Sequence, residues 1–287
     1  MLYYALMITS VFVIYEFITL NFKPALFIEL PRQRVNTYGA TFLGLFYRPR
    51  GFAEESGHMS LFFEFCIPLL IPYIKNLKFS HKIASILIVL IALILLSSSF
   101  TIFISLLILG TYFFIKSLQN LKVLIISSII ALSFILFVAT NEKSRDYVDK
   151  YSNSIFKKVS LNKENNSVND RTIRFQEAIG LVKDNFFFGI GAMAFKEYSS
   201  SASSLNMVLD LWMFSGFLGL LCLVFFTFVT CLNYYYAITP NKFGVFLALF
   251  ILIIHYQIIT NFWYPFLWVL FGIMQAETKK YNALKTV

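Results

Sequence analysis

Long uncharged apolar runs make up most of the chain, and shorter polar segments separate them. A helix needs about 20 apolar residues to cross the ~30 Å hydrocarbon core of a bilayer, so such runs indicate membrane spans. The pattern predicts an all-α fold, a polytopic integral membrane helix bundle with about eight transmembrane helices. We expect them roughly at residues 1–22, 58–74, 83–98, 100–115, 122–140, 204–231, 243–260 and 262–276.

The uncharged stretch 83–115 decides the number of spans. As one helix it would be about 50 Å long at 1.5 Å per residue, which is too long for one crossing. Serine favours helix caps and turns, so we expect a break at Ser97-Ser98-Ser99. The two spans that result also keep the lysines of the short loops on one side.

Those lysines predict the orientation of the chain in the bilayer. The short loops and both termini share one side and carry nine lysines against one acid, Glu277. Lysine enrichment of this kind is typical of cytoplasmic loops. The sequence therefore predicts a single integral membrane domain of residues 1–287 with both termini in the cytoplasm. Two long outer loops, 23–57 and 141–203, then face the periplasm or the cell exterior.

The overall composition excludes a single water-soluble core. Apolar residues of the AVILMFWYC set make up 58% of the chain, charged residues 14%, and the mean hydropathy is +0.72. The net charge of +9 would suggest nucleic acid in a soluble protein. Here the lipid bilayer is the expected surrounding, and no nucleic-acid partner is expected.

Arginine is confined to the two long loops, which hold all seven arginines, whereas every cation of the short loops is a lysine. The planar guanidinium binds phosphate or carboxylate through two hydrogen bonds, while lysine acts as a point charge. The distribution indicates an anionic ligand bound from outside. The alternative is that these arginines pair with acids of the same loops.

Residues 46–60 bring several charged groups together just before the second expected span. Pro49 and Gly51 favour an irregular turn there. We expect a pyrophosphate or sugar site in which arginines bind the anion and a carboxylate or histidine acts as general base or orienting group. The alternative is an ion cluster that anchors the helix end. The residues concerned are Arg48, Arg50, Glu54, Glu55 and His58.

The second long loop is expected to begin as a flexible solvated segment and then to form an amphipathic helix. Asn169 or Asp170 is expected to cap a helix over 169–185, in which Arg171 and Arg174 lie one turn apart. Glycines at 189 and 191 then permit a sharp return to the membrane.

Four ionisable residues fall inside expected spans, and such residues are functional candidates because an unpaired charge in hydrocarbon is costly. They are Glu16, Glu64, Asp210 and His255.

Four motifs occur in an order that is typical of one family of membrane proteins. Arg48-Pro-Arg-Gly-Phe-Ala-Glu-Glu-Ser is similar to an Arg-x-x-Gly-Phe-x-x-Glu-Pro-Ser segment, and Leu96-Ser-Ser-Ser to a serine-rich hairpin. Residues 169–191 resemble an arginine-centred helix followed by Asn-Pro-Leu-Phe-Gly-Ile-Gly, and Asn206 with Gly216 and Gly219 resembles a His-Asn pair before a glycine-bearing helix. Over roughly residues 40–220 the chain thus resembles the bacterial O-antigen polymerase and O-antigen ligase superfamily, the Wzy and WaaL proteins. Leu205 stands where the ligase-type pair has histidine, which favours a polymerase.

The resemblance implies a glycosyltransferase of lipopolysaccharide or capsule assembly at the outer face of the bacterial inner membrane. Its donor would be an oligosaccharide repeat unit carried on undecaprenyl pyrophosphate. The resemblance implies that Arg171 is the main pyrophosphate-binding residue, followed by Arg48 and Arg50 and then Arg174. Asn206 and Asp210 complete the predicted substrate-binding residues. Glu55 and His58 are the candidate catalytic residues. We expect no metal or other cofactor, because no Asp-x-Asp motif occurs. A chain-length regulator and a flippase are expected partners.

Other functions remain open at this point. An O-antigen ligase would transfer the glycan to a lipid or protein acceptor. A transporter or flippase of lipid-linked sugars also has many spans and buried acids, but it tends to show paired repeats with broken helices, and no repeat is seen. A non-enzymatic assembly subunit is a further alternative, and it predicts that substitution of Arg171 is tolerated.

Overall fold

The computed structural model describes residues 1–28, 30, 41–42, 46–96, 166–192, 194–199, 203–237, 239, 241–257 and 264–285. The expected spans 100–115 and 122–140, the break at Ser97-Ser98-Ser99 and the expected flexible segment lie outside these residues.

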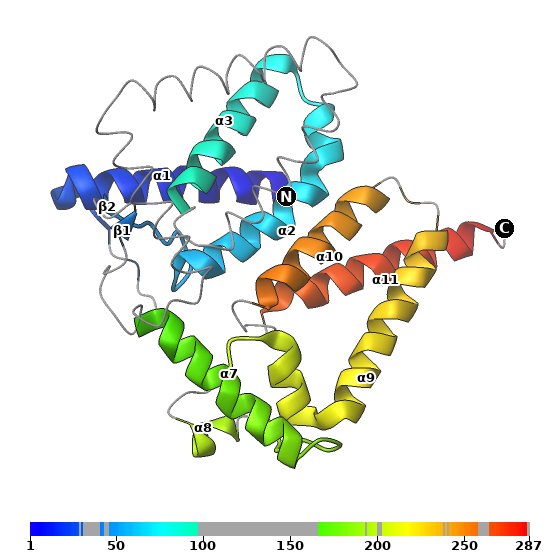
Figure 1. Cartoon of the computed structure of the whole chain (residues 1–287). Coiled ribbons are helices and arrows are strands. Elements are labelled where there is room, and N and C mark those ends of the chain that lie inside the picture. The colour runs from blue at the N-terminus through cyan, green and yellow to red at the C-terminus, as the bar shows by residue number, and fades with distance from the viewer. Residues whose placement is uncertain are drawn as a thin grey trace, which may run out of the picture. The chain divides into compact units, whose positions relative to one another are not determined.

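The described residues are mostly helical and contain eight α-helices (Figure 1). The α-helices are α1 (Leu2–Phe22), α2 (Ser56–Lys75), α3 (Phe79–Leu96), α7 (Asn166–Asp184), α8 (Phe195–Tyr198), α9 (Met207–Tyr236), α10 (Lys242–Tyr256) and α11 (Pro265–Lys285). One 3-10 turn, η1 (Pro24–Leu26), follows α1. Two short strands, β1 (Thr41–Phe42) and β2 (Phe46–Tyr47), pair in antiparallel fashion with Phe42 opposite Phe46.

The predicted membrane fold is confirmed, since α1, α2, α3 and α9 are long and apolar enough to cross a bilayer. They coincide with the expected spans near 1–22, 58–74, 83–98 and 204–231. The 15 residues of α10 extend about 22 Å, less than the hydrocarbon core. The last two and a half turns of α11 carry several charged residues, including Glu277, Lys279 and Lys280. Whether α10 and α11 cross the bilayer stays a prediction.

The chain folds as two compact units. The first, called here the C-terminal unit, comprises Met1–Met7, Leu61–Leu87 and Asn166–Val287. The second, called the N-terminal unit, comprises Ile8–Ser60 and Ile88–Asn165.

In the C-terminal unit, α9 is not one continuous helix. Gly216 has φ 69° and ψ −176°, which interrupts the helix and changes its direction (Figure 1). Residues 207–215 form a first segment that packs on α7, and residues 217–236 form a second, straight segment. The second segment contains 20 residues and extends about 30 Å, the thickness of the hydrocarbon core. The expected span at 204–231 is therefore interrupted at Gly216, and the part of α9 that follows is by itself long enough to cross a bilayer.

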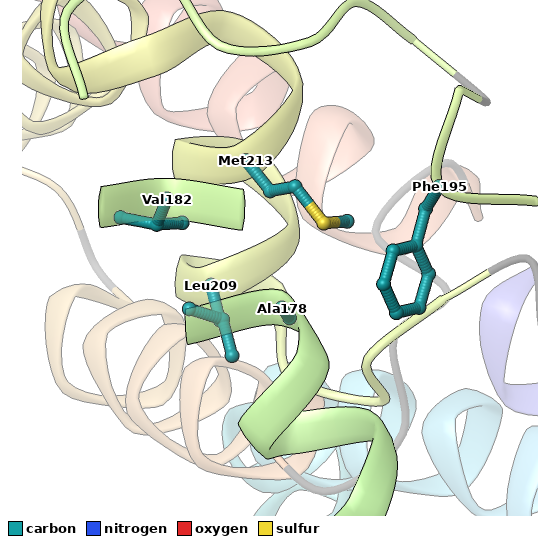
Figure 2. Close-up of a cluster of buried hydrophobic side chains, with 5 residues drawn as sticks. All are labelled: Ala178, Val182, Phe195, Leu209 and Met213. Atoms are coloured by element: carbon teal, nitrogen blue, oxygen red, sulfur yellow. The ribbon is translucent and has the colours of Figure 1, made fainter. Parts of the chain in front are cut away.

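A small apolar core joins the first segment of α9 to α7 and α8. Ala178 and Val182 of α7 lie against Leu209 of α9, and Met213 points toward Phe195 of α8 (Figure 2). The apolar positions of the predicted helix 169–185 are Ile173, Ala178, Ile179 and Val182; Ala178 and Val182 are buried in this core, whereas Ile173 is exposed.

The other helices of the C-terminal unit approach one another at small or polar residues. The Asn241 side-chain amide donates to the Leu69 carbonyl over 2.8 Å, next to Gly244, where a Cβ would lie 2.3 Å from the Pro68 carbonyl oxygen. Glycine at this position therefore lets α10 lie directly against α2. The Tyr234 hydroxyl donates to Glu277 over 2.8 Å and joins α9 to α11.

Candidate functional site

In the N-terminal unit, α1 holds the segment that carries Arg48 and Arg50, here called the arginine turn (residues 47–52). The Tyr47 backbone N–H donates to the Asn21 side-chain oxygen over 2.6 Å, and the Asn21 amide donates back to the Tyr47 carbonyl over 3.0 Å. One carboxylate oxygen of Glu16 accepts from the backbone N–H groups of Arg50 (2.8 Å) and Gly51 (2.6 Å). The backbone is thus fixed on both sides of Arg48.

The conformation of the arginine turn requires glycine at position 51. Gly51 has φ +62°, and a Cβ there would lie 2.5 Å from the Met59 sulfur and 3.1 Å from Val13. The next residue, Phe52, stacks on Phe12 of α1 with ring centroids 4.3 Å apart. The irregular turn predicted from Pro49 and Gly51 is therefore present, and its contacts with α1 favour one conformation.

The arginine turn brings two guanidiniums close to the carboxylates of Glu16 and Glu55. Arg50 is 7% exposed and Arg48 is half-buried. Burial lowers the pKa of Arg48; the Glu55 carboxylate raises this pKa and the Arg50 guanidinium lowers it. Both guanidiniums stay charged, since arginine keeps its proton in proteins. Two guanidiniums on one short, fixed turn can bind an anionic group such as a phosphate through charge-assisted hydrogen bonds.

The two candidate catalytic residues lie where α2 begins. Glu55 is exposed and precedes α2, and its carbonyl accepts the first helical hydrogen bond from Met59 over 3.1 Å. His58 is half-buried in the first turn. The Ser56 hydroxyl does not cap the helix but donates to the Pro49 carbonyl over 2.7 Å, which ties α2 to the arginine turn. The structure therefore brings Glu55 together with Arg48 and Arg50.

The second arginine pair lies on α7 in the C-terminal unit. This helix begins at Asn166, three residues before the predicted start, so Asn169 and Asp170 lie within its first turns and do not precede it. Arg171 belongs to α7, and its side chain lies outside the described part of the chain. Arg174 is half-buried one turn later. The predicted spacing of one helical turn between the two arginines is confirmed.

Asp210 and Asn206 organise the loop that leads into α9. Asp210 is fully buried, and its carboxylate accepts from the Ser203 hydroxyl (2.7 Å), the Ser204 hydroxyl (2.5 Å) and the Ser204 backbone N–H (2.8 Å). Asn206 caps α9 by accepting from the Leu209 N–H over 3.0 Å and donates to the Gln257 carbonyl over 3.2 Å. These bonds also hold Leu205 at φ 65°, a conformation that is uncommon for leucine. Both residues thus shape the loop, and a role in substrate binding stays a prediction.

Glu64 and His255 form a buried pair between α2 and α10. The Glu64 carboxylate lies 2.5 Å from His255 Nδ1, and each residue is 2% exposed. Such a carboxylate fixes the orientation and tautomer of the imidazole. Among the described residues, His255 Nε2 and the neighbouring Tyr256 hydroxyl are buried without a hydrogen-bond partner. Sequence reasoning identified both ionisable residues but not their pairing, because 191 positions separate them.

The glycine-rich loop after α7 enters the break in α9. The Ile190 and Gly191 N–H groups donate to the Met213 (2.8 Å) and Phe214 (3.0 Å) carbonyls, while the Phe217 N–H donates to the Phe186 carbonyl over 2.8 Å. The loop thus supplies hydrogen-bond partners for backbone N–H and carbonyl groups that have no partner within the helix because the helix is interrupted.

Glycine is required on both sides of this contact. A Cβ on Gly216 (φ +69°) would lie 2.0 Å from the Phe187 carbonyl oxygen, and a Cβ on Gly189 (φ +71°) would lie 2.6 Å from the Gly216 nitrogen. The chain does turn sharply at Gly189 and Gly191, where it contacts the interior of α9; that this turn leads back to the membrane stays a prediction.

Most of α3, all of α7 and α8 and the first half of α9 lie in one region of similarity to known proteins. Residues 84–224 match the O-antigen ligase family. This O-antigen ligase region is just under half of the chain and contains Arg171, Arg174, Asn206, Asp210 and the glycine contacts; the arginine turn precedes it. The match supports the predicted superfamily and indicates a glycosyl-transferring enzyme of polysaccharide assembly, without deciding between polymerase and ligase. No curated protein and no solved structure matches the chain.

Sequence reasoning did not include Glu16 and Asn21 in the site. Glu16 was identified only as an ionisable residue inside an expected span, and Asn21 gave no signal. Both side chains form hydrogen bonds with backbone groups about 26 to 35 positions away in the sequence. No pattern of side chains along the sequence indicates such contacts.

Proposed function

We propose that the protein is a surface-polysaccharide polymerase that joins oligosaccharide repeat units carried on undecaprenyl pyrophosphate, at the outer face of the bacterial inner membrane. The observation that carries this proposal is the arginine turn. Its backbone is fixed by the Glu16 carboxylate, and it presents two guanidiniums and the Glu55 carboxylate next to a helix apolar enough to cross the membrane. The match to the O-antigen ligase family supports the reaction class.

In the proposed reaction, a sugar hydroxyl of the acceptor attacks the anomeric carbon of the donor glycan. The bond from this carbon to the diphosphate oxygen breaks, and the electron pair leaves with the undecaprenyl diphosphate. Arg48 and Arg50 stabilise the charge that builds on the diphosphate, which fixed donors do best when they are oriented in advance. Glu55 or His58 takes the hydroxyl proton. Both polymerase substrates carry a diphosphate, and Arg171 and Arg174 are proposed as the second anion-binding pair.

A ligase is the second candidate, and the observation that favours it is the family to which residues 84–224 match. It would use the same donor chemistry with a lipid or protein acceptor. The two activities predict different products in cells. Loss of a polymerase leaves single repeat units attached to their acceptor, whereas loss of a ligase leaves full-length glycan that is not attached.

The experiment is a repeat-unit ladder of surface polysaccharide from a strain that lacks the gene, complemented at matched membrane expression. We expect wild type and Lys23→Ala to restore the ladder, because Lys23 is an exposed cation that follows α1, and its backbone bonds go to Thr19 and Leu26, outside the proposed site. Arg50→Ala and Arg171→Ala are expected to leave the single-repeat product. If the deletion strain makes glycan of normal length that is not attached to its acceptor, the protein is a ligase. A full ladder with Arg50→Ala would refute the proposed site.

A further inference from the structure

The loop between α7 and α8 carries three consecutive phenylalanines, residues 186–188, called here the aromatic loop. Phe186 packs against Trp212 and Phe217 of α9, with ring centroids 5.2 Å and 5.4 Å away. Phe187 and Phe188 are 59% and 82% exposed. Two exposed phenylalanines on a backbone fixed by glycines are costly in water, because each offers a large apolar surface.

The backbone contacts fix the height of this loop along α9. The Phe217 N–H donates to the Phe186 carbonyl over 2.8 Å, and the Leu218 N–H lies 3.5 Å from the Phe187 carbonyl. The aromatic loop therefore lies level with the first turn of the straight segment, residues 217–236. Exposed apolar side chains continue from the loop down this segment, including Leu218, Leu221 and Phe225.

The straight segment has a second aromatic group at its other end. Tyr235 and Tyr236 are 60% and 69% exposed just before the loop that leads to Lys242. From Gly216 to Tyr235 an α-helix rises about 28 Å, close to the ~30 Å thickness of the hydrocarbon core. Tyrosine and tryptophan gather at both membrane–water interfaces, and Trp212 packs against Phe186 of the aromatic loop. If the tyrosines mark one interface, the aromatic loop lies at the opposite one.

We propose that Phe187 and Phe188 insert into the bilayer interface on the side predicted to face outward, and that this contact holds α7 at the membrane surface. Lipid is the partner that contacts the aromatic loop. The apolar surface of the loop is continuous with that of the straight segment of α9, and α9 is largely exposed and apolar enough to cross a membrane. In Figure 1, α7 runs across the direction of that segment, as expected of a helix that lies along the bilayer.

The effect of this membrane contact on substrate binding rests on the proposed function. A polyprenyl diphosphate has its chain in the hydrocarbon and its charge at the interface. A helix held at that interface keeps Arg171 and Arg174 near the depth of the diphosphate, so that the substrate reaches them without leaving the bilayer. The aromatic loop would thus set the position of the second anion-binding pair.

The test is a spin-label depth measurement on the full-length protein in nanodiscs of phosphatidylethanolamine and phosphatidylglycerol. Cys66, Cys222 and Cys231 are replaced by alanine, and single cysteines are introduced by Phe188→Cys, Phe225→Cys and Lys196→Cys. Phe225 lies in the straight segment, and Lys196 is an exposed cation on α8. We expect the label at 188 to collide with oxygen, like that at 225 but at shallower depth, and to be protected from a water-soluble nickel complex that reaches the label at 196.

Two outcomes would overturn the proposal. A label at 188 as accessible to nickel as the label at 196 would place the loop in water. A label shielded from both oxygen and nickel would show that protein covers the loop. Neither readout needs enzymatic activity, so a failed insertion is distinguishable from a failed polymerase assignment.

A second experiment tests the consequence for activity. In the complemented deletion strain, the double variant Phe187→Ser/Phe188→Ser is expected to shorten the ladder several-fold at matched membrane expression. Phe187→Trp/Phe188→Trp should retain it, because tryptophan suits the interface. Equal ladders from the serine and tryptophan variants would refute the positioning role even if the label shows insertion.

Discussion

The arginine turn and the glycine-rich loop of α9 are both irregular segments held against a helix, but they are held by different groups. In the arginine turn, the side chains of Glu16 and Asn21 bind backbone groups, so polar side chains determine the geometry. In the glycine-rich loop, backbone binds backbone, and what matters is the absence of side chains at Gly189 and Gly216. The first arrangement should respond to loss of a charge or an amide, the second to any added Cβ.

The largest effect is expected where a Cβ meets backbone. Gly216→Ala combines a positive φ with a clash against the Phe187 carbonyl, so we expect a loss of about 4 kcal/mol or more in the free energy of unfolding. Thermal unfolding in detergent, together with the amount of protein in the membrane, measures it. The matched control is Gly272→Ala in α11, where a Cβ meets nothing within 4 Å. It should stay within about 1 kcal/mol of wild type. Equal losses for the two variants would contradict the backbone contact.

Substitution of the buried Glu64–His255 pair tests whether side-chain contacts also stabilise the C-terminal unit. His255→Ala removes the imidazole that binds the buried Glu64 carboxylate, and we expect a loss of about 3 kcal/mol in the free energy of unfolding. The double variant Glu64→Gln/His255→Ala removes the charge as well and should lose less than the single variant. Thermal unfolding of the two variants side by side gives the comparison; a larger loss in the double variant would mean that the pair does not act as a unit.

Loss of the Glu16 carboxylate is expected to disorganise the arginine turn while the helices remain folded. Glu16→Ala leaves two backbone N–H groups without their acceptor, at a cost of about 2 kcal/mol, and the repeat-unit ladder should collapse to the single repeat. Glu16→Gln keeps an acceptor oxygen and should retain part of the ladder. If both variants give a full ladder at matched expression, the turn does not depend on Glu16.

The smallest effect is expected at Asn21, whose bonds to Tyr47 are exposed to solvent. Asn21→Ala should cost about 1 kcal/mol and shorten the ladder only slightly, because water can replace the lost partner. Asn21→Asp keeps the acceptor for the Tyr47 N–H and should behave more like wild type. A loss as large as that of Glu16→Ala would show that the two ends of the turn contribute equally.

The sequence predicted most of the described helices, because apolar periodicity and charge mark their positions directly. It also located the helix around Arg171 and the turn at Gly189. It did not predict the break in α9, since residues 204–231 are apolar on both sides of Gly216, and a single glycine is common in a membrane helix. The break exists because a loop about 30 residues earlier supplies its hydrogen bonds, and such a distant backbone partner leaves no local pattern.

The same limit applies to the candidate site. Arg48, Arg50 and Glu55 were found together because they are close in sequence. The acceptor groups on α1 and the Glu64–His255 pair were not found as contacts, because they depend on how helices pack. Side-chain chemistry can be read along the chain, whereas the partners of backbone groups emerge only in three dimensions.

The break at Gly216 also solves a problem of helix length. As one straight helix, the 30 residues of α9 would extend about 45 Å and exceed the bilayer by half its thickness, so the helix would have to tilt or slide to hide its apolar surface. The break removes that freedom by turning the first two and a half turns aside. A segment of matching length is then available to the bilayer, and we expect the backbone contact at Gly216, without any charged residue, to keep the helix from sliding.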